Sequence, residues 1–370
     1  MLSPEVDNIN YRVGVKARSN TCLHGGTYSV NPNLVKVDFS SNVNPLGISK
    51  LVLESIQKSA FSISSKYPDT QCRALKESLL DYLDNGLNYE WIGVGNGATE
   101  LIHSFAQTFI RNRVIIPFPT FCEYESASKR MGANILLVPL KNLILDPDII
   151  IEKAKKSDVI FLCNPNNPTG LICSKSIQKV IEGVDSSTKI LVDECFIELS
   201  DDKPDNYTMI NRVKEFNNLV ILRSMTKSFG LAGLRIGYII CNPRLIKRLS
   251  HNQIPWNVNG IAQMAGIVAL RDLNHLTRSR ALIKKERNFM QHMINIKMHS
   301  FIPYRSDVNY FLIYLKNKNS IKIRDSILAR NGVLVRDCST FIGMGVKYIR
   351  VAVRTHEENL LLLDALESVD

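Results

Sequence analysis

The sequence has no long hydrophobic run and no recognisable export signal. No stretch reaches about 18 consecutive apolar residues, the least that a membrane-spanning helix needs. Residues 1–10 have neither the basic segment nor the apolar segment of a secretory signal peptide. We therefore expect a protein that has no membrane partner and works in the cytoplasm.

Cysteine is present, but its spacing excludes the common metal and redox motifs. The eight cysteines include no C-x-x-C pair and no zinc-type spacing. We therefore expect no bound metal, and thiols that stay reduced. Low-complexity linkers are also absent, so any boundary between domains should fall within continuous secondary structure.

Acidic residues are fewer than basic ones. Lys and Arg number 46 against 35 Asp and Glu, which gives a net charge of +11. Nucleic-acid-binding proteins concentrate such a surplus in a stripe or patch, whereas the basic residues here lie in short scattered groups such as Lys284, Lys285 and Arg287. We therefore expect no nucleic-acid partner and a general attraction for small anionic substrates.

Between residues 92 and 240, short apolar runs alternate with amphipathic segments. The runs are 114–116, 135–138, 159–163, 189–192, 219–222 and 236–240. Continuous apolar strands that alternate with helices are typical of a mostly parallel sheet covered on both faces. The predicted fold class is therefore α/β, and ligands are expected at the carboxyl ends of the strands.

Three segments are expected along the chain. Residues 1–50 are rich in Asn, Ser, Gly and Pro and are predicted to form an N-terminal arm that packs with a small domain. Residues 51–260 form the large domain, and residues 261–370 a long linking helix and a small C-terminal α+β domain. The linking helix is predicted over about 260–294, and the strands of the small domain over 309–315, 333–336 and 348–353.

The residues with the clearest chemical meaning join two of the strand-like runs. Lys227 follows Ser224 and Thr226, and Arg235 comes a few positions later. A lysine attacks an aldehyde only as the free amine, while hydroxyls and a guanidinium can hold a phosphate. The set suits pyridoxal phosphate, which carries both groups. A surface loop with an incidental lysine is the alternative that this stretch alone leaves open.

Other candidate cofactor contacts follow predicted strands. Asp193 ends an apolar run, where a buried carboxylate needs a partner such as a protonated pyridine nitrogen, unless it caps the next segment. Asn167 lies in a turn made rigid by prolines, and Phe121 can lie flat on an aromatic ring or belong to the core. The amides of Ala98 and Thr99 open a helix and can bind phosphate, unless this segment is a plain turn.

Candidate substrate contacts lie in the tail and in the arm. Arg336, Arg350 and Arg354 lie in or beside predicted strands, where a guanidinium can bind a carboxylate or phosphate, and at least one of them is expected on the surface. Arg350 and Arg354 are an even number of residues apart and should share a sheet face. His24 precedes two glycines that let the backbone approach a ligand, so it is either a clamp on an anionic substrate or an ordinary loop histidine.

Together these motifs resemble the class I and II aminotransferases, which are fold-type I pyridoxal-phosphate enzymes, over nearly the whole chain. The resemblance rests on N-P-N-N-P-T-G at 164–170, on Asp193, and on S-x-T-K at 224–227 followed by G-L-R-x-G at 233–237. It implies a homodimer in which Lys227 bonds covalently to the cofactor aldehyde and Asp193 bonds the ring nitrogen. The other implied cofactor contacts are Ala98, Thr99, Phe121, Asn167, Ser224, Thr226, Arg235 and, from a second subunit, Tyr67. The implied substrate contacts are His24, Gly25, Asn42, Asn167, Arg336 and Arg350.

Within this family the chain most resembles the threonine-phosphate decarboxylases of cobalamin biosynthesis, through D-F-S-S-N-V-N-P-L-G at 38–47 and I-P-W-N-V-N at 254–259. The resemblance implies decarboxylation of L-threonine O-3-phosphate to (R)-1-aminopropan-2-ol O-phosphate. The alternative is histidinol-phosphate aminotransferase, similar through F-G-L-A-G-L-R at 229–235, or another phospho-amino-acid decarboxylase or aminotransferase. Phe196 departs from the aminotransferase pattern, which has a tyrosine there. A binding domain without turnover is disfavoured, because Lys227 and Asp193 are both present.

Overall fold

The computed structural model describes residues 23–155 and 157–370, so the predicted arm is described only from Leu23 onward. Its largest element is a seven-stranded sheet in the order β2-β8-β7-β6-β5-β3-β4. Only β8 runs antiparallel to its neighbours. The strands are β2 (Ile92–Gly95), β3 (Arg113–Phe118), β4 (Asn134–Pro139), β5 (Val159–Cys163), β6 (Lys189–Asp193), β7 (Leu219–Ser224) and β8 (Gly237–Cys241). The predicted α/β class with a mostly parallel sheet is confirmed.

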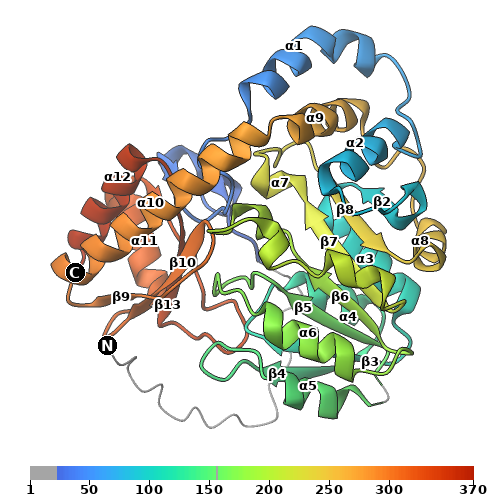
Figure 1. The fold of residues 1–370 in the computed structure, drawn as a ribbon. Helices are drawn as coiled ribbons and strands as arrows, with labels where there is room; N and C mark the ends of the chain where they lie inside the picture. The colour runs from blue at the N-terminus through green and yellow to red at the C-terminus, as the bar shows by residue number, and fades with distance from the viewer. Residues whose placement is uncertain (1–22, 156) are drawn as a thin grey trace.

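Helices cover both faces of this sheet, as Figure 1 shows. Successive strand residues point to opposite faces, and Leu191 of β6 accordingly packs in one core cluster while Ile190 and Val192 pack in another. The first cluster includes side chains of α3 (Gly97–Phe109), α4 (Glu123–Arg130) and α8 (Pro243–Ser250). The second includes side chains of α1 (Lys50–Ser64), α2 (Arg73–Leu83), α5 (Pro147–Ala154) and α6 (Ser174–Gly183). Burial on both faces explains why the strands read as continuous apolar runs.

The predicted linking helix is two helices, α9 (Gly260–Arg271) and α10 (Leu273–Lys297). Asp272 lies between them with a non-helical backbone, φ −94° and ψ 64°, and its side chain accepts a hydrogen bond from the His275 amide at 3.2 Å. An aspartate in this position caps a new helix start. The prediction of one helix over 260–294 is therefore wrong, because a capping residue interrupts the apolar pattern that suggested it.

A second, four-stranded antiparallel sheet follows in the order β12-β13-β10-β9. Its strands are β9 (Phe301–Pro303), β10 (Tyr310–Leu315), β12 (Arg336–Asp337) and β13 (Tyr348–Ala352), and α11 (Ser320–Asn331) and α12 (His356–Glu367) accompany them. From the arm, β1 (Val37–Asp38) pairs in parallel with β11 (Val333–Leu334). The arm thus lies against the small sheet region, and α10 runs from α9 to α12 (Figure 1).

The described helices and cysteines bear on two expectations from the sequence, the lack of a membrane-spanning segment and the reduced state of the thiols. None of the helices within the described ranges is long and apolar enough to cross a membrane. Cys72, Cys163, Cys173, Cys195, Cys241 and Cys338 are free thiols. Cys122 is disulfide-bonded, so for this residue the expectation of a reduced thiol is wrong. The spacing argument considered only short-range pairs and could not exclude a bond between distant cysteines.

Candidate active site

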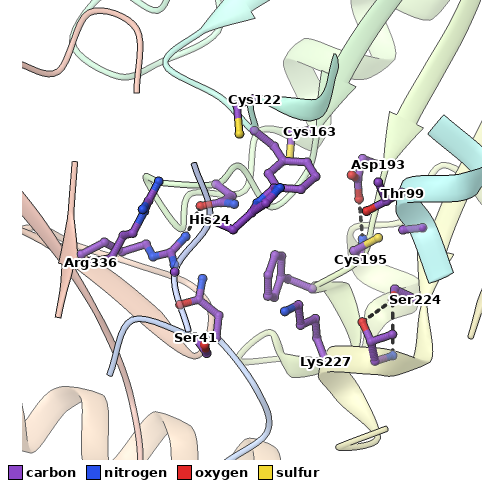
Figure 2. Close-up of a pocket in the computed structure, with 18 of the residues that line it drawn as sticks. His24, Ser41, Thr99, Cys122, Cys163, Asp193, Cys195, Ser224, Lys227 and Arg336 are labelled. Carbon is purple, nitrogen blue, oxygen red and sulfur yellow. Dashed lines mark hydrogen bonds between the residues drawn. The ribbon is translucent and has the colours of Figure 1, made fainter. Parts of the chain in front are cut away.

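A cavity of about 330 Å³ opens where β5, β6 and β7 end, between the large sheet, the arm and the small sheet. Every sequence-predicted cofactor and substrate residue except Tyr67 and Arg354 lines it. Figure 2 shows His24, Asp193, Lys227 and Arg336 around the same space. Those near the large sheet are Ala98, Thr99, Phe121, Asn167, Asp193, Ser224, Thr226, Lys227 and Arg235. Those from the arm and the small sheet are His24, Gly25, Asn42, Arg336 and Arg350.

Lys227 lies in α7 (Met225–Ser228), a short helix that directly follows β7. The side chain of Ser224 caps this helix by accepting a hydrogen bond from the Thr226 amide at 3.3 Å. Burial, followed by the positive charges of Arg350 and Arg235, lowers the pKa of Lys227 from 10.5 to about 8. The free amine, which is the form that reacts with an aldehyde, is therefore accessible near neutral pH.

The groups expected to hold a phosphate lie on one side of the cavity. The hydroxyls of Ser224 and Thr226 are 2.7 Å apart. The amides of Ala98 and Thr99 lie in the first turn of α3, where backbone N–H groups have no partner within the helix. Hydroxyls and a helix N-terminus together make a site for an anion.

Two glycines allow these groups to approach one another. Gly97 has φ +77°, and a Cβ there would lie 2.7 Å from Nη2 of Arg235. A Cβ at Gly237 would lie 2.7 Å from the amide nitrogen of Ala98. The Arg235 guanidinium is held by a hydrogen bond to the carbonyl oxygen of Ala232 at 3.1 Å. The guanidinium, the helix start and the strand end thus form a close cradle that fits a phosphate.

Asp193 is the buried last residue of β6. The Tyr124 hydroxyl donates to its Oδ2 at 2.6 Å, and the Cys195 amide donates to its Oδ1 at 2.9 Å. Burial raises the pKa of Asp193 despite these hydrogen bonds. A cationic ring nitrogen in the cavity would relieve that burial penalty. No motif marks Tyr124 in the sequence, so the sequence analysis missed the residue that orients this carboxylate.

Two arginines face each other on the opposite side, because Arg336 of β12 pairs with Arg350 of β13 in the small sheet. Arg350 is buried, donates to the side-chain oxygen of Asn167 and donates to the carbonyl oxygen of Ser40 at 2.7 Å. Its Nε has no partner within the described chain. Burial lowers the pKa of Arg350 to about 10. An incompletely partnered buried cation is a strong candidate to bind an anion.

The arm closes the cavity beside these arginines. A Cβ at Gly25 would lie 2.6 Å from the carbonyl oxygen of Ser40, so only glycine fits this approach. Asn42 is buried, and its Oδ1 has no partner among the described residues. The ring of His24 lines the cavity and lies 5.8 Å from the ring of Phe121. These residues come from the segment that the sequence analysis treated as an arm without its own core.

Tyr67 and Arg354 lie outside the cavity. The Tyr67 side chain is 83% exposed and packs on Trp256 with ring centroids 5.0 Å apart. This exposure leaves the Tyr67 ring accessible to a second chain. Arg354 donates to Glu358 at 2.7 Å and to the carbonyl oxygen of Asp38 at 3.4 Å, so its role is to tie the arm to α12.

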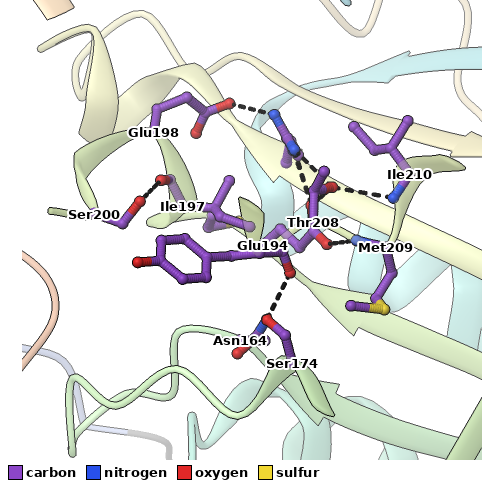
Figure 3. Close-up of polar contacts among 12 residues, drawn as sticks. Asn164, Ser174, Glu194, Ile197, Glu198, Ser200, Thr208, Met209 and Ile210 are labelled. Carbon is purple, nitrogen blue, oxygen red and sulfur yellow. Dashed lines mark hydrogen bonds and ion pairs between the residues drawn. The ribbon is translucent and has the colours of Figure 1, made fainter. Parts of the chain in front are cut away.

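A buried charge cluster lies behind the cavity wall (Figure 3). Arg223 donates to Glu194 at 3.0 Å and to Glu198 at 3.0 Å, and the Ser228 hydroxyl donates to Glu198 at 3.1 Å. The backbone amide of Met209 donates a further hydrogen bond to the Glu194 carboxylate at 2.7 Å. Although burial opposes it, the two glutamates raise the pKa of Arg223 well above its usual value. The sequence analysis did not predict this cluster, although Glu194, Arg223 and Ser228 adjoin cavity residues in the chain.

The cavity also has lining residues to which the sequence analysis gave no site role. They are Leu23, Ser40, Ser41, Cys122, Cys163, Cys195, Phe196 and Phe341. Phe196 packs edge-on against Tyr310 with ring centroids 4.9 Å apart. A signal for Ser40 and Ser41 was available, because both lie in the D-F-S-S-N motif beside Asn42.

Comparisons with known proteins place this geometry in a family. The family model described as aminotransferase class I and II matches residues 35–366. A protein of Caldanaerobacter subterraneus subsp. tengcongensis, provisionally named a threonine-phosphate decarboxylase, is 34% identical over 336 residues, covering 89% of each chain. Several further relatives are named histidinol-phosphate aminotransferases.

Solved structures represent the same two activities. The histidinol-phosphate aminotransferase of Clostridium acetobutylicum has a TM-score of 0.84 and 33% identity, covering 90% of this chain and 98% of its own. The L-threonine-O-3-phosphate decarboxylase of Porphyromonas gingivalis has a TM-score of 0.80 and 26% identity, covering 90% and 99%. The matches therefore agree on the fold and the family and divide over the reaction.

Proposed function

Because this chain belongs to the class I and II aminotransferase family, whose members depend on pyridoxal phosphate, we propose that it decarboxylates L-threonine O-3-phosphate. The products are (R)-1-aminopropan-2-ol O-phosphate and carbon dioxide, and we propose a place for the reaction in cobalamin biosynthesis. The similarity to proteins named threonine-phosphate decarboxylases supports this choice.

The cavity residues fit the cofactor from end to end. Lys227 offers an amine with a lowered pKa, Asp193 a buried carboxylate, and Arg235 with the start of α3 a cradle for phosphate. When bound, pyridoxal phosphate supplies an electron sink for the bond that breaks at the substrate's α-carbon. In our proposal Asp193 holds the ring nitrogen protonated and Phe121 packs on the ring face. The freed Lys227 amine returns a proton to the α-carbon.

The observation that carries the choice of substrate is the set of nitrogen donors opposite Lys227. His24, Arg336 and Arg350 line the same part of the cavity. L-threonine O-3-phosphate carries a carboxylate and a phosphate, whereas histidinol phosphate carries a phosphate alone. Two facing guanidiniums and an imidazole suit the substrate with two anionic groups.

Bond choice follows from how the substrate carboxylate is held. The residues that bind the carboxylate would decide between loss of carbon dioxide and loss of the α-proton, because the bound cofactor would accept the electrons of either bond. We propose that Arg336 and Arg350 would hold the substrate carboxylate in the orientation from which carbon dioxide leaves. Phe196 adds to this proposal, because it provides no hydroxyl for the cofactor where the aminotransferase pattern has a tyrosine.

Histidinol-phosphate aminotransferase is the second candidate. It is favoured by the segment Phe229–Arg235 and by the 33% identity to the Clostridium acetobutylicum enzyme. In that reaction the α-proton leaves in place of carbon dioxide, and the amino group is passed to 2-oxoglutarate.

One experiment separates the candidates. Purified, cofactor-loaded protein is incubated with L-threonine O-3-phosphate and, separately, with histidinol phosphate plus 2-oxoglutarate, and carbon dioxide and glutamate are measured. Carbon dioxide without glutamate is the expected result. Glutamate without carbon dioxide would overturn the proposal in favour of the aminotransferase. The Lys227→Ala protein serves as the background control for both assays.

We also propose that the protein is a cytoplasmic homodimer in which Tyr67 completes the cofactor site of the partner. Tyr67 lies near other exposed apolar side chains, including Trp256 at 50% exposure and, in the same loop, Ile254 at 74%. Sedimentation of the cofactor-loaded protein should give twice the mass of one chain. A monomer that is fully active would contradict this proposal.

A further inference from the structure

Behind His24 lies a carboxylate with both oxygens occupied. Oε1 of Glu123 lies 2.8 Å from Nε2 of His24, and Oε2 lies 2.9 Å from Nε2 of His103. Glu123 is the buried first residue of α4, and His103 is a partly buried residue of α3. The arm and two consecutive helices thus meet at one carboxylate. Neither the sequence motifs nor the proposed mechanism assigns a role to Glu123.

The ionised carboxylate of Glu123 determines which nitrogen of the His24 ring can contact a ligand. Hydrogen bonds from His103 and His24 lower the pKa of Glu123 to about 2, so it is an acceptor only. Nε2 of His24 must therefore donate to Glu123, and Nδ1 is the nitrogen left for a ligand; it donates to an anion when both ring nitrogens carry a proton. Cys122 lies beside both groups, but it is disulfide-bonded and offers no thiolate for a metal ion.

His24 needs this support because few other contacts hold its side chain within the described part of the chain. Its side chain is 51% exposed, it belongs to the arm, and its other recorded contact is the ring of Phe121 at 5.8 Å. A side chain with such freedom loses conformational entropy when it binds a ligand, unless a neighbour has already fixed it. The neighbouring arginine does not fix it, since Arg336 donates to the carbonyl oxygen of Leu23 at 2.5 Å and thereby holds the arm backbone.

We propose that Glu123 is a positioning residue for substrate recognition, which holds the His24 ring so that Nδ1 meets the anionic group of the phosphorylated substrate. His103 in turn holds Glu123 from α3. This inference rests on the proposed function only in so far as the substrate carries a phosphate, and both candidate substrates do.

The test compares Glu123→Ala with Glu123→Gln and with Glu125→Ala. Glu125 lies on the same helix and pairs with Lys129 at 2.8 Å on the outside, so its loss controls for changes in α4. With whichever substrate is turned over, Glu123→Ala should raise KM roughly tenfold and leave kcat within about twofold. Glu123→Gln should lie nearer to the wild type, because its amide oxygen still accepts from Nε2. Glu125→Ala should change neither parameter.

A double-mutant cycle shows whether Glu123 acts through His24. In a His24→Ala background, Glu123→Ala should raise KM no further. An equal rise in both backgrounds, a fall in kcat with KM unchanged, or no effect of Glu123→Ala would each overturn the inference. If thermal melting shows that Glu123→Ala is poorly folded, His103→Ala replaces it, with an expected KM rise of roughly two- to threefold; an unchanged KM would then overturn the inference.

A binding measurement keeps this test separate from the proposed reaction. If neither substrate is turned over, calorimetric titration of the cofactor-loaded protein with inorganic phosphate replaces KM. Weaker phosphate binding in both His24→Ala and Glu123→Ala, with unchanged binding in Glu125→Ala, would support the inference while the proposed function fails. Equal phosphate binding in all variants would reject the role of Glu123 itself.

Discussion

Two groups of buried charged side chains lie on opposite sides of the strand ends. They differ in how many of their polar atoms have a hydrogen-bond or ion-pair partner. Behind the cavity wall, Arg223 bonds Glu194 and Glu198 at 3.0 Å each. In the cavity, Arg350 keeps an Nε without a partner in the described chain and has a pKa lowered by burial to about 10. In the first group the protein supplies the partners of the charged atoms, whereas in the second group a ligand is needed to supply them.

Strand alternation produces this contrast. Asp193 and Glu194 are consecutive, as are Arg223 and Ser224, and one of each pair lines the cavity while the other enters the charge cluster. Ser228 extends the cluster to the residue after Lys227. Asp193, Ser224 and Lys227 each therefore have a chain neighbour that is bonded within the cluster. We infer that the partnered cluster carries stability and that the unpartnered cavity carries function.

The largest expected effect is on the cavity side. Lys227→Ala should reduce turnover on the order of 10³-fold or more, because it removes both the covalent anchor and the proton carrier. At neutral pH the unfolding free energy should not fall, because burial already disfavours the charged amine that is removed. Lys189→Ala is the control: Lys189 begins β6, and its amine donates to the backbone carbonyl oxygens of Ser186 and Ser187 at 3.0 Å, away from the cavity. Retention of more than a tenth of the turnover in Lys227→Ala would contradict the assignment.

The next effect belongs to the partnered cluster. Arg223→Gln should lower the unfolding free energy by roughly 3 to 5 kcal/mol, because it leaves two buried glutamates without their cation. Urea denaturation of the cofactor-free protein measures this loss. Arg324→Gln is the control, since Arg324 pairs with Asp325 near the surface and should cost less than about 1 kcal/mol. If the two variants were equally stable, the inference that the buried charge cluster contributes the stability would be refuted.

The pH dependence of stability sharpens the contrast. The pKa of Lys227 falls from 10.5 to about 8 in the folded, cofactor-free protein. Between pH 8 and 10.5 the unfolded chain therefore binds more protons at this residue, so folding stability rises with pH across that window. Relative to Lys227→Met, the wild type should gain on the order of 3 kcal/mol there. Urea titrations at several pH values would show the stability difference shifting in favour of the wild type as the pH rises, and a constant difference would contradict this expectation.

Much of the fold and of the site follows from short-range features of the sequence. Continuous apolar runs predict the parallel sheet, because strands buried on both faces need apolar residues at every position. Asp193, Ser224 and Lys227 are predictable, because each lies at or just after the end of such a run, where a parallel sheet gathers its ligand-binding groups.

Other features depend on contacts between distant segments. Tyr124 orients Asp193 across 69 positions, and Glu123 meets His24 across 99. No spacing rule links residues so far apart, so only the packing of α4 against the strand ends and the arm reveals them. The break at Asp272 was missed for a local reason: a single capping side chain outweighs an apolar pattern that continues on both sides of it.

The smallest expected effect compares two arginines of the small sheet region. Arg350→Gln should raise KM for L-threonine O-3-phosphate roughly tenfold to a hundredfold, since it removes a charge-assisted bond to an anionic group. Its unfolding free energy should change by less than about 1 kcal/mol, because burial already disfavours the charge that is removed. Arg354→Gln provides the control, because Arg354 bonds Glu358 and Asp38 outside the cavity and should leave KM unchanged. Steady-state kinetics and urea denaturation on both variants decide the matter. If Arg350→Gln lost stability as Arg223→Gln does and kept its KM, Arg350 would belong with the structural cluster, and the cavity would have to recognise its anion through Arg336 and His24.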